Sequence, residues 1–343
     1  MTRSIAIVMV NYRTPDLAIA ALESAAGERA ALPGLRAILV DGGSGDGSAE
    51  KLAEALAASP LAEWVELLPL PINGGFGWAN NQAIQRLLQR DDPPDYIHLL
   101  NPDTVVEPGA IARLADTLDA YPRCGAVGSL LLEADGSASG SAFAFPTIGG
   151  EMVRGGRMAI LQRLFAPGKL VSFGDAAEEV EWATGASVMF RSAALRDSGL
   201  FDTGFFLYFE EVELMWRMRK AGWSIRHEPA SRIGHVGGAA TGVNGSRPTD
   251  RRPKLPPYWY GSRRRFWALT GSRGRAVAAS SAWLAGHGLL LARRLLGSAR
   301  QHAIVDRDAR AMLAHGLVPN RRDCTPAVAR WDDPPGTPPA WMA

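Results

Sequence analysis

Cysteine is scarce in this chain. Only Cys124 and Cys324 occur among its 343 residues, so no disulfide framework is expected, and a reducing cytoplasm fits the composition. An excess of charge of one sign is also missing, because 37 Lys and Arg against 35 Asp and Glu leave a formal net charge of +2. A nucleic-acid partner is therefore not expected. Hydrophobic residues make up 47% of the chain, which is enough to bury the core of a globular protein.

Long apolar runs are lacking as well. The apolar run at residues 5–10 is too short for a signal peptide, and no cleavage pattern follows it. The nearest approach to a membrane span, residues 276–292, contains Ser280, Ser281 and His287 and sits at the short limit. We expect an amphipathic or interfacial segment there. The protein is accordingly expected in the cytoplasm, either free or peripheral at the inner face of the plasma membrane.

Two nucleotide-binding motifs are absent. The turn from Asp41 to Ser48 has glycines at 43, 45 and 47, which do not match the dinucleotide-binding motif G-x-G-x-x-G. An enzyme that transfers a hydride from a dinucleotide is therefore disfavoured. No G-x-x-x-x-G-K-[ST] occurs either, which disfavours a P-loop kinase or ATPase. What remains is Asp41 at a strand end, suited to accepting a hydrogen bond from a pyrimidine ring N–H. A plain Asp-Gly turn is the alternative.

The first half of the chain does contain a regular alternation of short apolar strands and helical stretches. Strands are predicted, with helices between them, at residues 5–10, 37–40, 64–68 and 96–100. Thr14 followed by Pro15 is typical of a helix start, because proline at the first helical position gives up no needed donor. The pattern predicts an α/β fold with a doubly wound, mostly parallel sheet flanked by helices. From residue 125 to 191 the rhythm loosens, and we expect mobile loops there.

Polar residues directly follow three of these strands. They are Asn11 and Tyr12, then Asp41, then Asn101 and Asp103. Because ligands of open α/β sheets bind at the carboxyl ends of the strands, we expect a site at this edge. A carboxylate such as Asp103 can hold Mg²⁺ or Mn²⁺, hard cations that prefer oxygen ligands and bridge to phosphates. His235 is the best candidate for a second ligand, although a lone histidine is more often structural.

Three acids begin a helical pattern at residues 210–221. Glu210, Glu211 and Glu213 stand where the helix dipole favours negative charge, which is a purely structural explanation for them. The apolar run at residues 205–209 could also desolvate a carboxylate and raise its pKa toward that of a general base. We therefore expect one of Glu210 and Glu211 to be catalytic and the other to support it.

Six motifs occur in a fixed order along the chain. They are Val10-Asn11-Tyr12, Val40-Asp41-Gly-Gly-Ser, Asn73-Gly-Gly-Phe-Gly-Trp-Ala-Asn80-Asn81, Leu100-Asn-Pro-Asp103, Gly185-Ala-Ser-Val-Met-Phe-Arg191, and Phe201-Asp202 with the run from Phe206 to Glu213. In this order they resemble glycosyltransferase family 2, and its rhamnosyltransferase-like branch is the most similar. The resemblance covers residues 4 to 240 and depends on the order of the motifs, since none is decisive alone.

The resemblance implies a GT-A fold and an inverting single displacement. It places the base of the donor near Tyr12 and Asp41, and the diphosphate on a divalent metal, Mg²⁺ or Mn²⁺, held by Asp103 and His235. Asn101 stands where many relatives carry the first acid of a D-x-D motif. Glu211 replaces the usual Asp of the general base, and its longer side chain moves the carboxylate by about one C–C bond.

The same resemblance implies further contacts in the donor pocket. In addition to Asn11 and Tyr12, the residues expected there are Gly75, Asn81, Asn101, Trp182 and Gly185. Trp182 and Gly185 match the region where relatives contact the transferred sugar or the acceptor. For Asn81 and Trp182, helix capping and core packing are equally open explanations.

The chain changes character beyond these motifs. Residues 1–240 are predicted to form the catalytic domain, 241–318 a basic, mostly helical extension, and 319–343 a loose tail with six prolines. Between Arg247 and Arg310 there are fourteen Lys or Arg against three acids, interspersed with aromatic residues. Such a segment suits anionic lipid headgroups, and a homodimer contact or a helical cap on the catalytic domain is the alternative.

The expected function is that of an inverting glycosyltransferase. It would move a sugar from a nucleoside diphosphate donor to a hydroxyl of a glycan or lipid-linked acceptor in cell-surface polysaccharide synthesis. The branch favours rhamnose from dTDP-rhamnose, with UDP-sugars next. One alternative is a catalytically weak nucleotide-sugar or glycan-binding partner of a polysaccharide assembly complex, motivated by Asn101 and Glu211. Another is a sugar nucleotidyltransferase, although its usual basic glycine-rich loop is replaced here by Asn11 to Pro15.

Overall fold

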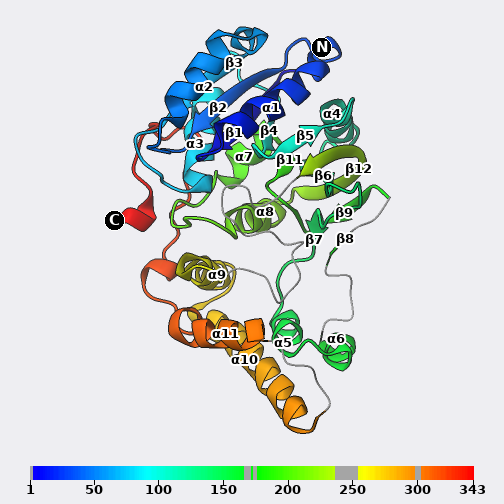
Figure 1. The fold of residues 1–343 in the computed structure, drawn as a ribbon, viewed down its shortest axis with the longest axis vertical. Coiled ribbons are helices and arrows are strands. Elements are labelled where there is room, and N and C mark those ends of the chain that lie inside the picture. Colours follow the sequence, from blue (N-terminus) through cyan, green and yellow to red (C-terminus); the bar gives the residue numbers. More distant parts are fainter. Residues whose placement is uncertain (1–2, 166–170, 173–175, 236–253, 298–302) are drawn as a thin grey trace.

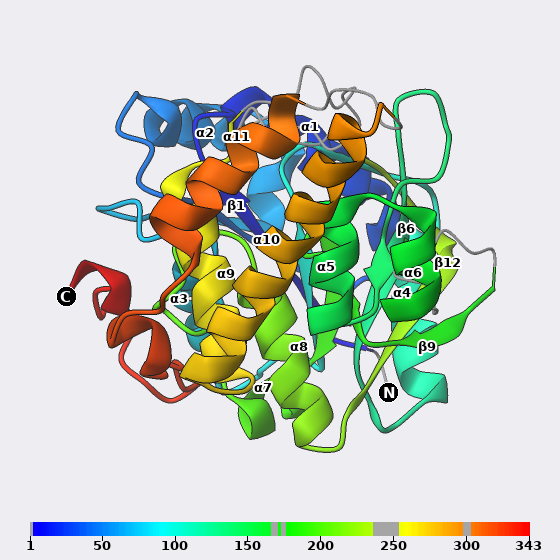
Figure 2. The ribbon, with the colours of Figure 1, turned by 90° about the horizontal axis from the view of Figure 1, so that it is seen from below.

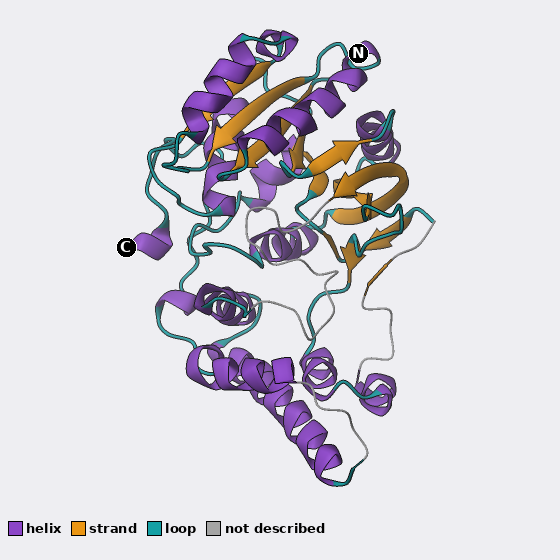
Figure 3. Cartoon of the chain, in the orientation of Figure 1, coloured by secondary structure: helices purple, strands orange, loops and turns teal. Residues whose placement is uncertain are grey.

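A mixed sheet flanked by helices forms the upper half of the molecule, and the lower half consists of helices (Figures 1 and 3). The computed structural model describes residues 3–165, 171–172, 176–235, 254–297 and 303–343. Four parallel strands run in the spatial order β3-β2-β1-β4. Their bounds are β1 (Ile5–Asn11), β2 (Arg36–Asp41), β3 (Val65–Pro69) and β4 (Tyr96–Leu100). All four match strands predicted from the sequence, and the predicted α/β fold with helices on both faces is confirmed.

The second part of the sheet is mixed in direction. Its strands continue the order as β11-β6-β12-β5, with β11 antiparallel to both of its neighbours. Their bounds are β5 (Thr104–Val106), β6 (Cys124–Leu132), β11 (Ser187–Arg191) and β12 (Ser224–His235), and β9 (Glu178–Val180) pairs with β12. A small separate sheet contains β7 (Ala142–Phe143), β8 (Val171–Ser172) and β10 (Trp182–Ala183).

The expectation of loops across residues 125–191 was therefore wrong for much of that segment. Every residue of β6 is buried, so the strand shows no alternation of polar and apolar residues that would reveal it. Its glycines serve close packing rather than turns, because a Cβ on Gly128 would lie 2.4 Å from the Cβ of Ala183. In β6, glycine and serine therefore indicate a closely packed sheet interior and not a turn.

Side-chain alternation on β1 separates two hydrophobic cores. Ile5, Ile7 and Met9 face one core and Ala6 and Val8 face the other. The first core is covered by α1 (Pro15–Ala26), α2 (Ser48–Ala57) and α4 (Ala110–Ala120). A short helical turn follows each of the first two helices, η1 (Gly27–Ala30) after α1 and η2 (Pro60–Glu63) after α2. The second core is covered by α3 (Phe76–Leu88), α7 (Ser192–Ser198) and α8 (Glu210–Lys220).

The lower helices come from two distant parts of the chain. They are α5 (Ile148–Gly156), α6 (Ala159–Phe165), α9 (Pro257–Leu269), α10 (Arg273–Leu295) and α11 (Ala303–Ala311), which continues into a π-helical turn, η4 (Met312–Gly316). Seen from below, α5 lies alongside α10 (Figure 2). Glycines allow this approach, because a Cβ on Gly155 would lie 2.0 Å from the Trp283 carbonyl oxygen and one on Gly286 2.1 Å from that of Met152. Among the described residues, no helix is long and apolar enough to cross a membrane.

The C-terminal segment is held against the part of the molecule that contains the sheet, so the expectation of a loose tail was wrong. Side chains of α3 donate to its backbone, as in the hydrogen bonds from Trp78 Nε1 to the Thr337 carbonyl (2.7 Å) and from Gln85 Nε2 to the Arg330 carbonyl (2.9 Å). Two 3₁₀ turns, η5 (Arg322–Cys324) and η6 (Ala340–Met342), belong to this segment. Proline removes backbone donors but leaves every carbonyl free to accept, so an irregular proline-rich chain can still be fixed by side-chain donors. The boundary predicted at residue 240 lies outside the described residues.

Candidate active site

A cavity of about 430 Å³ opens at the carboxyl ends of β1 and β4. Its walls come from the strand ends, the glycine-rich turn before α3, the turn before α8, the end of β12 and the start of α9. Eight residues that the sequence singled out line it together: Tyr12, Gly75, Asn101, Asp103, Gly185, Glu210, Glu211 and His235. Side chains far apart in sequence thus meet at the edge of the sheet where a ligand was expected.

Asn11 and Asp41, both predicted to bind the donor, lie side by side at the ends of β1 and β2, and neither lines this cavity. The parallel pairing of β1 and β2 places them opposite each other, and Asn11 Nδ2 donates to Asp41 Oδ1 at 2.8 Å. Ser44 also donates to Asp41, from Oγ at 2.6 Å and from its backbone N–H at 3.1 Å. Asp41 lines a second cavity with Gly43, Gly45 and Gly47. The buried Asp41 carboxylate is thus held in a fixed orientation at the end of β2.

Gly75 shows why the turn before α3 requires glycine. Its φ is +89°, in the left-handed region that side chains rarely adopt, and a Cβ there would lie 2.0 Å from the Phe206 carbonyl oxygen. The same carbonyl accepts a hydrogen bond from Phe76 N at 3.1 Å. The glycine motif therefore joins the strand-end side of the cavity to the turn that precedes α8.

Asp103 and His235 form a polar pair in the cavity wall. The antiparallel pairing of β5 and β12 sets His235 opposite Thr104, and Nε2 of His235 lies 3.3 Å from Oδ1 of Asp103. This nitrogen is buried and makes no hydrogen bond within the described residues. A carboxylate oxygen and an imidazole nitrogen facing each other fit a divalent cation. No group of three or more His, Cys, Asp or Glu in the described part of the chain could hold one, so other ligands would have to complete the coordination.

Glu210 and Glu211 enter the cavity from the first turn of α8. Glu210 is 2% exposed, and its Oε2 atom has no hydrogen-bond partner in the described structure. Burial, and then the neighbouring charge of Glu211, raises the pKa of Glu210 well above its ordinary value. Burial also raises the pKa of Glu211, although backbone N–H groups at the helix start favour its charged form. Because the charge of Glu211 acts on Glu210, the two carboxyls do not both ionise readily, and the pair is able to hold one proton and accept another.

The third acid of the motif has a structural role. Glu213 pairs with Arg217, whose Nε lies 2.8 Å from Glu213 Oε1. Arg217 also donates to the carbonyl of Gly199 at 3.2 Å and to that of Leu200 at 2.6 Å. This ion pair fastens α8 to the end of α7 and does not reach the cavity lining.

Asn81 and Trp182, both expected in the donor pocket, are not brought to the cavity lining. The Asn81 amide donates to the Phe201 carbonyl at 2.9 Å and accepts from Phe201 N at 3.0 Å. Trp182 stacks on Phe143 with 4.3 Å between ring centroids, and its Nε1 donates to the Ala144 carbonyl. Their polar groups are used within the fold, because a buried backbone segment needs partners for its own N–H and C=O groups.

The sequence reasoning missed Tyr258 at the start of α9. Tyr258 lines the cavity and packs against Phe206 and Tyr208, with ring centroids 5.1 Å and 6.2 Å away. Burial raises its pKa. The sequence did show aromatic residues among the arginines of this segment. Their spacing, however, does not indicate that one of them lines the cavity at the strand ends.

Comparison with known proteins places this geometry in a family. Residues 4–141 match the model described as glycosyl transferase family 2. In Mycobacterium tuberculosis, an N-acetylglucosaminyl-diphospho-decaprenol L-rhamnosyltransferase, found in two strains, is 33% identical over 218 residues, which cover 60% of this chain and 67% of the relative. A mannosyltransferase from Pyrobaculum calidifontis, solved in complex with GDP-Man and Mn²⁺, aligns with a TM-score of 0.50 at 12% identity, covering 92% of this chain and 71% of the other.

The sheet order and the structural likeness show the GT-A fold, and the family model and the rhamnosyltransferase relative show that the protein is a glycosyltransferase. In sequence, this chain is more similar to the rhamnosyltransferase relative, at 33% identity, than to the mannosyltransferase of known structure, at 12% identity. The chain belongs to glycosyl transferase family 2. The family and the enzyme class expected from the six motifs are thereby confirmed.

Proposed function

We propose that this glycosyltransferase transfers rhamnose from dTDP-rhamnose to a hydroxyl of a lipid-linked glycan, in the synthesis of a cell-surface polysaccharide. The observation that carries the proposal is the meeting of two pairs in one cavity, Asp103 with His235 and Glu210 with Glu211. The first pair suits the diphosphate of a donor and the second suits the hydroxyl of an acceptor. The rhamnosyltransferase relative supports the choice of sugar and of a polyprenyl diphosphate acceptor, and UDP-sugars are the next candidates.

The donor would lie along the strand ends. Its base would be held near Tyr12 and Asp41, and the cavity wall formed by Gly75 and Asn101 would face the ribose and diphosphate. Asp103 and His235 would hold Mg²⁺ or Mn²⁺. A cation bound there would neutralise negative charge on the leaving diphosphate.

In the proposed reaction, Glu211 takes the proton of the acceptor hydroxyl. The hydroxyl oxygen forms a bond to the anomeric carbon as the bond from that carbon to the diphosphate oxygen breaks, with inversion of configuration. Glu211 suits this role because it lines the cavity, is only half-buried and has a raised pKa. Glu210 is more deeply buried and would keep its proton, which leaves Glu211 as the ionised member of the pair.

The proposal is tested by transfer from dTDP-rhamnose to a short-chain analogue of N-acetylglucosaminyl-diphospho-polyprenol, with and without Mn²⁺. UDP-galactose, UDP-N-acetylglucosamine and GDP-mannose serve as competing donors. We expect metal-dependent transfer with dTDP-rhamnose, and a matching rise in melting temperature when the donor binds. Transfer with another donor would replace the sugar assignment. Donor binding without transfer to any acceptor would favour a nucleotide-sugar-binding role.

We also propose that the C-terminal end of α10 rests on an anionic membrane. Leu295 is 89% exposed and Leu296 80% exposed, next to the exposed Arg293 and the partly exposed Arg294. The helix end extends to the bottom of the molecule in Figure 1. Apolar side chains flanked by arginines suit a surface of anionic headgroups, where a lipid-linked acceptor would be found. The basic segment noted in the sequence also contains arginines that lie outside the described residues, namely Arg247, Arg251, Arg252 and Arg300.

Flotation with phosphatidylglycerol vesicles tests this contact on the full chain. Removing residues 247–343 would not, because α9 and the C-terminal segment are part of the fold. Replacing Leu295 and Leu296 together by serine should abolish flotation and leave the melting temperature unchanged. The matched control replaces Val105, which is 57% exposed on the upper sheet. If the double variant floats like wild type, the membrane contact is wrong; if instead it dissociates a dimer, α10 is a subunit interface.

A further inference from the structure

The turn before the catalytic acids has a strained backbone. Tyr208 and Phe209, the two residues directly before Glu210, have φ angles of 72° and 69°. Both values lie in the left-handed region, which residues with a Cβ seldom adopt. Consecutive aromatic residues in this conformation persist only where surrounding contacts hold them. The direction in which α8 begins, and therefore the position of its two carboxyls, depends on those contacts.

Helix α9 contacts this turn along its length. Ser262 Oγ donates to the Leu207 carbonyl at 2.8 Å. The Phe209 ring lies between Trp259 and Phe266 of α9, with centroids 5.6 Å away in each case. Together with the packing of Tyr258 on Phe206 and Tyr208, these contacts reach every residue from 206 to 209. The helix thus supplies the external contacts that the strained backbone requires.

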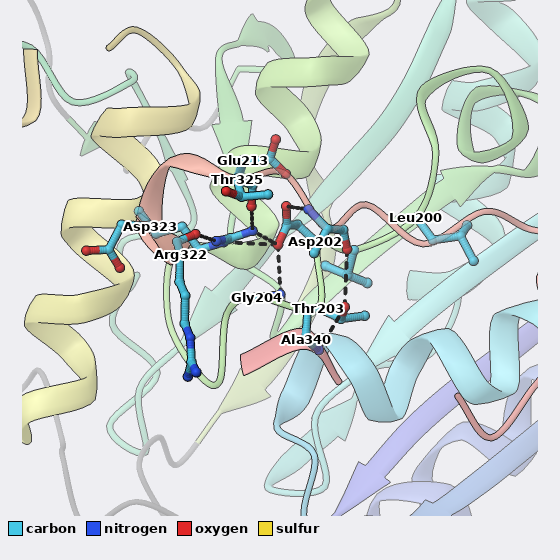
Figure 4. A network of polar contacts seen from close by, with 12 residues as sticks. Leu200, Asp202, Thr203, Gly204, Glu213, Arg322, Asp323, Thr325 and Ala340 are labelled. Atoms are coloured by element: carbon cyan, nitrogen blue, oxygen red, sulfur yellow. Dashed lines mark hydrogen bonds and ion pairs between the residues drawn. The ribbon is translucent and has the colours of Figure 1, made fainter. Parts of the chain in front are cut away.

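Arg265 of α9 holds the start of the same turn. Its Nη2 and Nε lie 2.6 Å and 3.0 Å from Oδ1 of Asp202, and both side chains are almost fully buried. The same guanidinium donates to the carbonyls of Arg322 at 2.6 Å and Thr325 at 2.8 Å. Asp202 also accepts from Gly204 N and Ala327 N, each at 2.8 Å, and Figure 4 shows this network around Asp202. One arginine therefore joins the turn, α9 and the C-terminal segment.

Gly204 shows how closely Arg265 approaches the turn. A Cβ at that position would lie 2.2 Å from Cζ of the guanidinium. On the other side, the C-terminal segment packs against the turn through Trp341. The Trp341 ring lies 5.0 Å from that of Phe206, its backbone N donates to the Thr203 carbonyl, and its Nε1 donates to the Gly74 carbonyl at 2.8 Å. The turn is therefore fixed between α9 and the last residues of the chain.

We propose that Arg265 and Trp341 are positioning residues for the transfer reaction. They hold the turn from Asp202 to Phe209 so that Glu210 and Glu211 face the cavity, and neither residue lines the cavity itself. This proposal rests on the proposed function in assigning the proton transfer to Glu211. A displaced general base costs turnover much more than it costs donor binding, since the donor is held at the strand ends.

The experiment compares Arg265→Met with Arg264→Met in the full chain. Arg264 is the neighbouring arginine on α9 and pairs with Asp323 at 2.9 Å, so its loss removes a similar charge and ion pair without touching the turn. We expect Arg265→Met to lower kcat by about tenfold or more while the donor KM stays within about twofold. Arg264→Met should change neither by more than about twofold. Hydrogen exchange at amides 203–213 should rise in the first variant only.

Trp341 supplies a second variant at the periphery, where loss of folding is less of a concern. Trp341→Ala should lower kcat with little change in donor KM, and Trp341→Phe should restore much of the loss, because it keeps the ring contact with Phe206. Equal kcat and unchanged exchange in Arg265→Met would overturn the proposal, as would a parallel loss of kcat and donor binding. If wild type transfers no sugar, the proposed function fails, and the exchange comparison still decides whether Arg265 holds the turn.

Discussion

The two halves of the cavity are built in different ways. The half proposed to bind the donor, called the donor half, contains Tyr12, Asn101 and Asp103 and follows directly from the ends of adjacent strands within the first 103 residues. The acid half, with Glu210 and Glu211, depends on a strained turn held by α9 and by the C-terminal segment. The family model matches residues 4–141, so it contains Tyr12, Asn101 and Asp103 but neither His235 nor the two acids. The comparison teaches that the strand-end residues of this chain are positioned by adjacent strands, whereas its two acids are positioned by contacts with segments far along the chain.

The largest effect is expected from the acid half. Glu211→Gln keeps the size of the side chain and removes its ability to accept a proton, so kcat should fall by about 10³-fold. Donor-induced stabilisation should persist, because the strand ends are untouched. Transfer kinetics and thermal shift on the same protein check both statements. Turnover close to wild type would mean that Glu210, or another group, is the base; Glu210→Gln is the matched variant.

A smaller effect, of a different kind, is expected from the donor half. Asp103→Asn removes the charge that would hold a divalent cation, and should lower kcat/KM by about 10²-fold. Unlike Glu211→Gln, it should also abolish the dependence of the donor-induced thermal shift on Mn²⁺. His235→Ala should act in the same direction. A Mn²⁺-dependent shift that survives both changes would show that the pair is not the cation site.

The pH dependence of turnover gives the next largest effect. Burial raises the pKa of Glu210 and Glu211, so the acidic limb of kcat should lie above the ordinary range of a glutamate. Below that limb the base carries its proton, and kcat should fall about tenfold per pH unit as the pH decreases. Steady-state rates across pH, with a buffer control for stability, measure this. A rate that stays flat down to pH about 4.5 would contradict a raised pKa of the base.

The smallest effect on catalysis is expected at Asn81. Because its amide satisfies both the N–H and the C=O of Phe201, Asn81→Ala should lower the free energy of unfolding by about 2 kcal/mol. The donor KM should stay within about twofold, since the side chain does not line the cavity. Chemical denaturation and kinetics on one preparation separate the two quantities. A large rise in donor KM with unchanged stability would return Asn81 to the donor pocket.

Local patterns predicted the donor half well. The four parallel strands were expected within one or two residues of their observed bounds. Such a strand can be recognised from its own residues, because it is a short apolar run with polar residues at each end. The helix beginning at Glu210 was predicted for the same reason. The pairing of Asp103 with His235 was expected from family resemblance, and the register of β5 with β12 brings them together.

The failures have a common physical cause. β6 is buried on both faces and so carries no alternation, and the proline-rich C-terminal segment is held by side chains of a helix far away in sequence. Asn81 and Trp182, predicted in the donor pocket, do not line the cavity, and a residue type alone does not reveal whether its polar group faces a cavity or a neighbouring backbone. Each of these features is determined by partners that lie far along the chain.

The amino-acid sequence by itself determined the strands, the polar residues at their ends and the acids at the start of α8, because these depend on short-range periodicity and on residue chemistry. The tertiary structure alone decided how those acids reach the cavity. The left-handed turn at Tyr208 and Phe209 is unfavourable in isolation, so it exists only where Arg265, Ser262 and Trp341 hold it. Contacts between segments so distant in sequence leave no local pattern, since their free energy is gained only when the whole chain has folded.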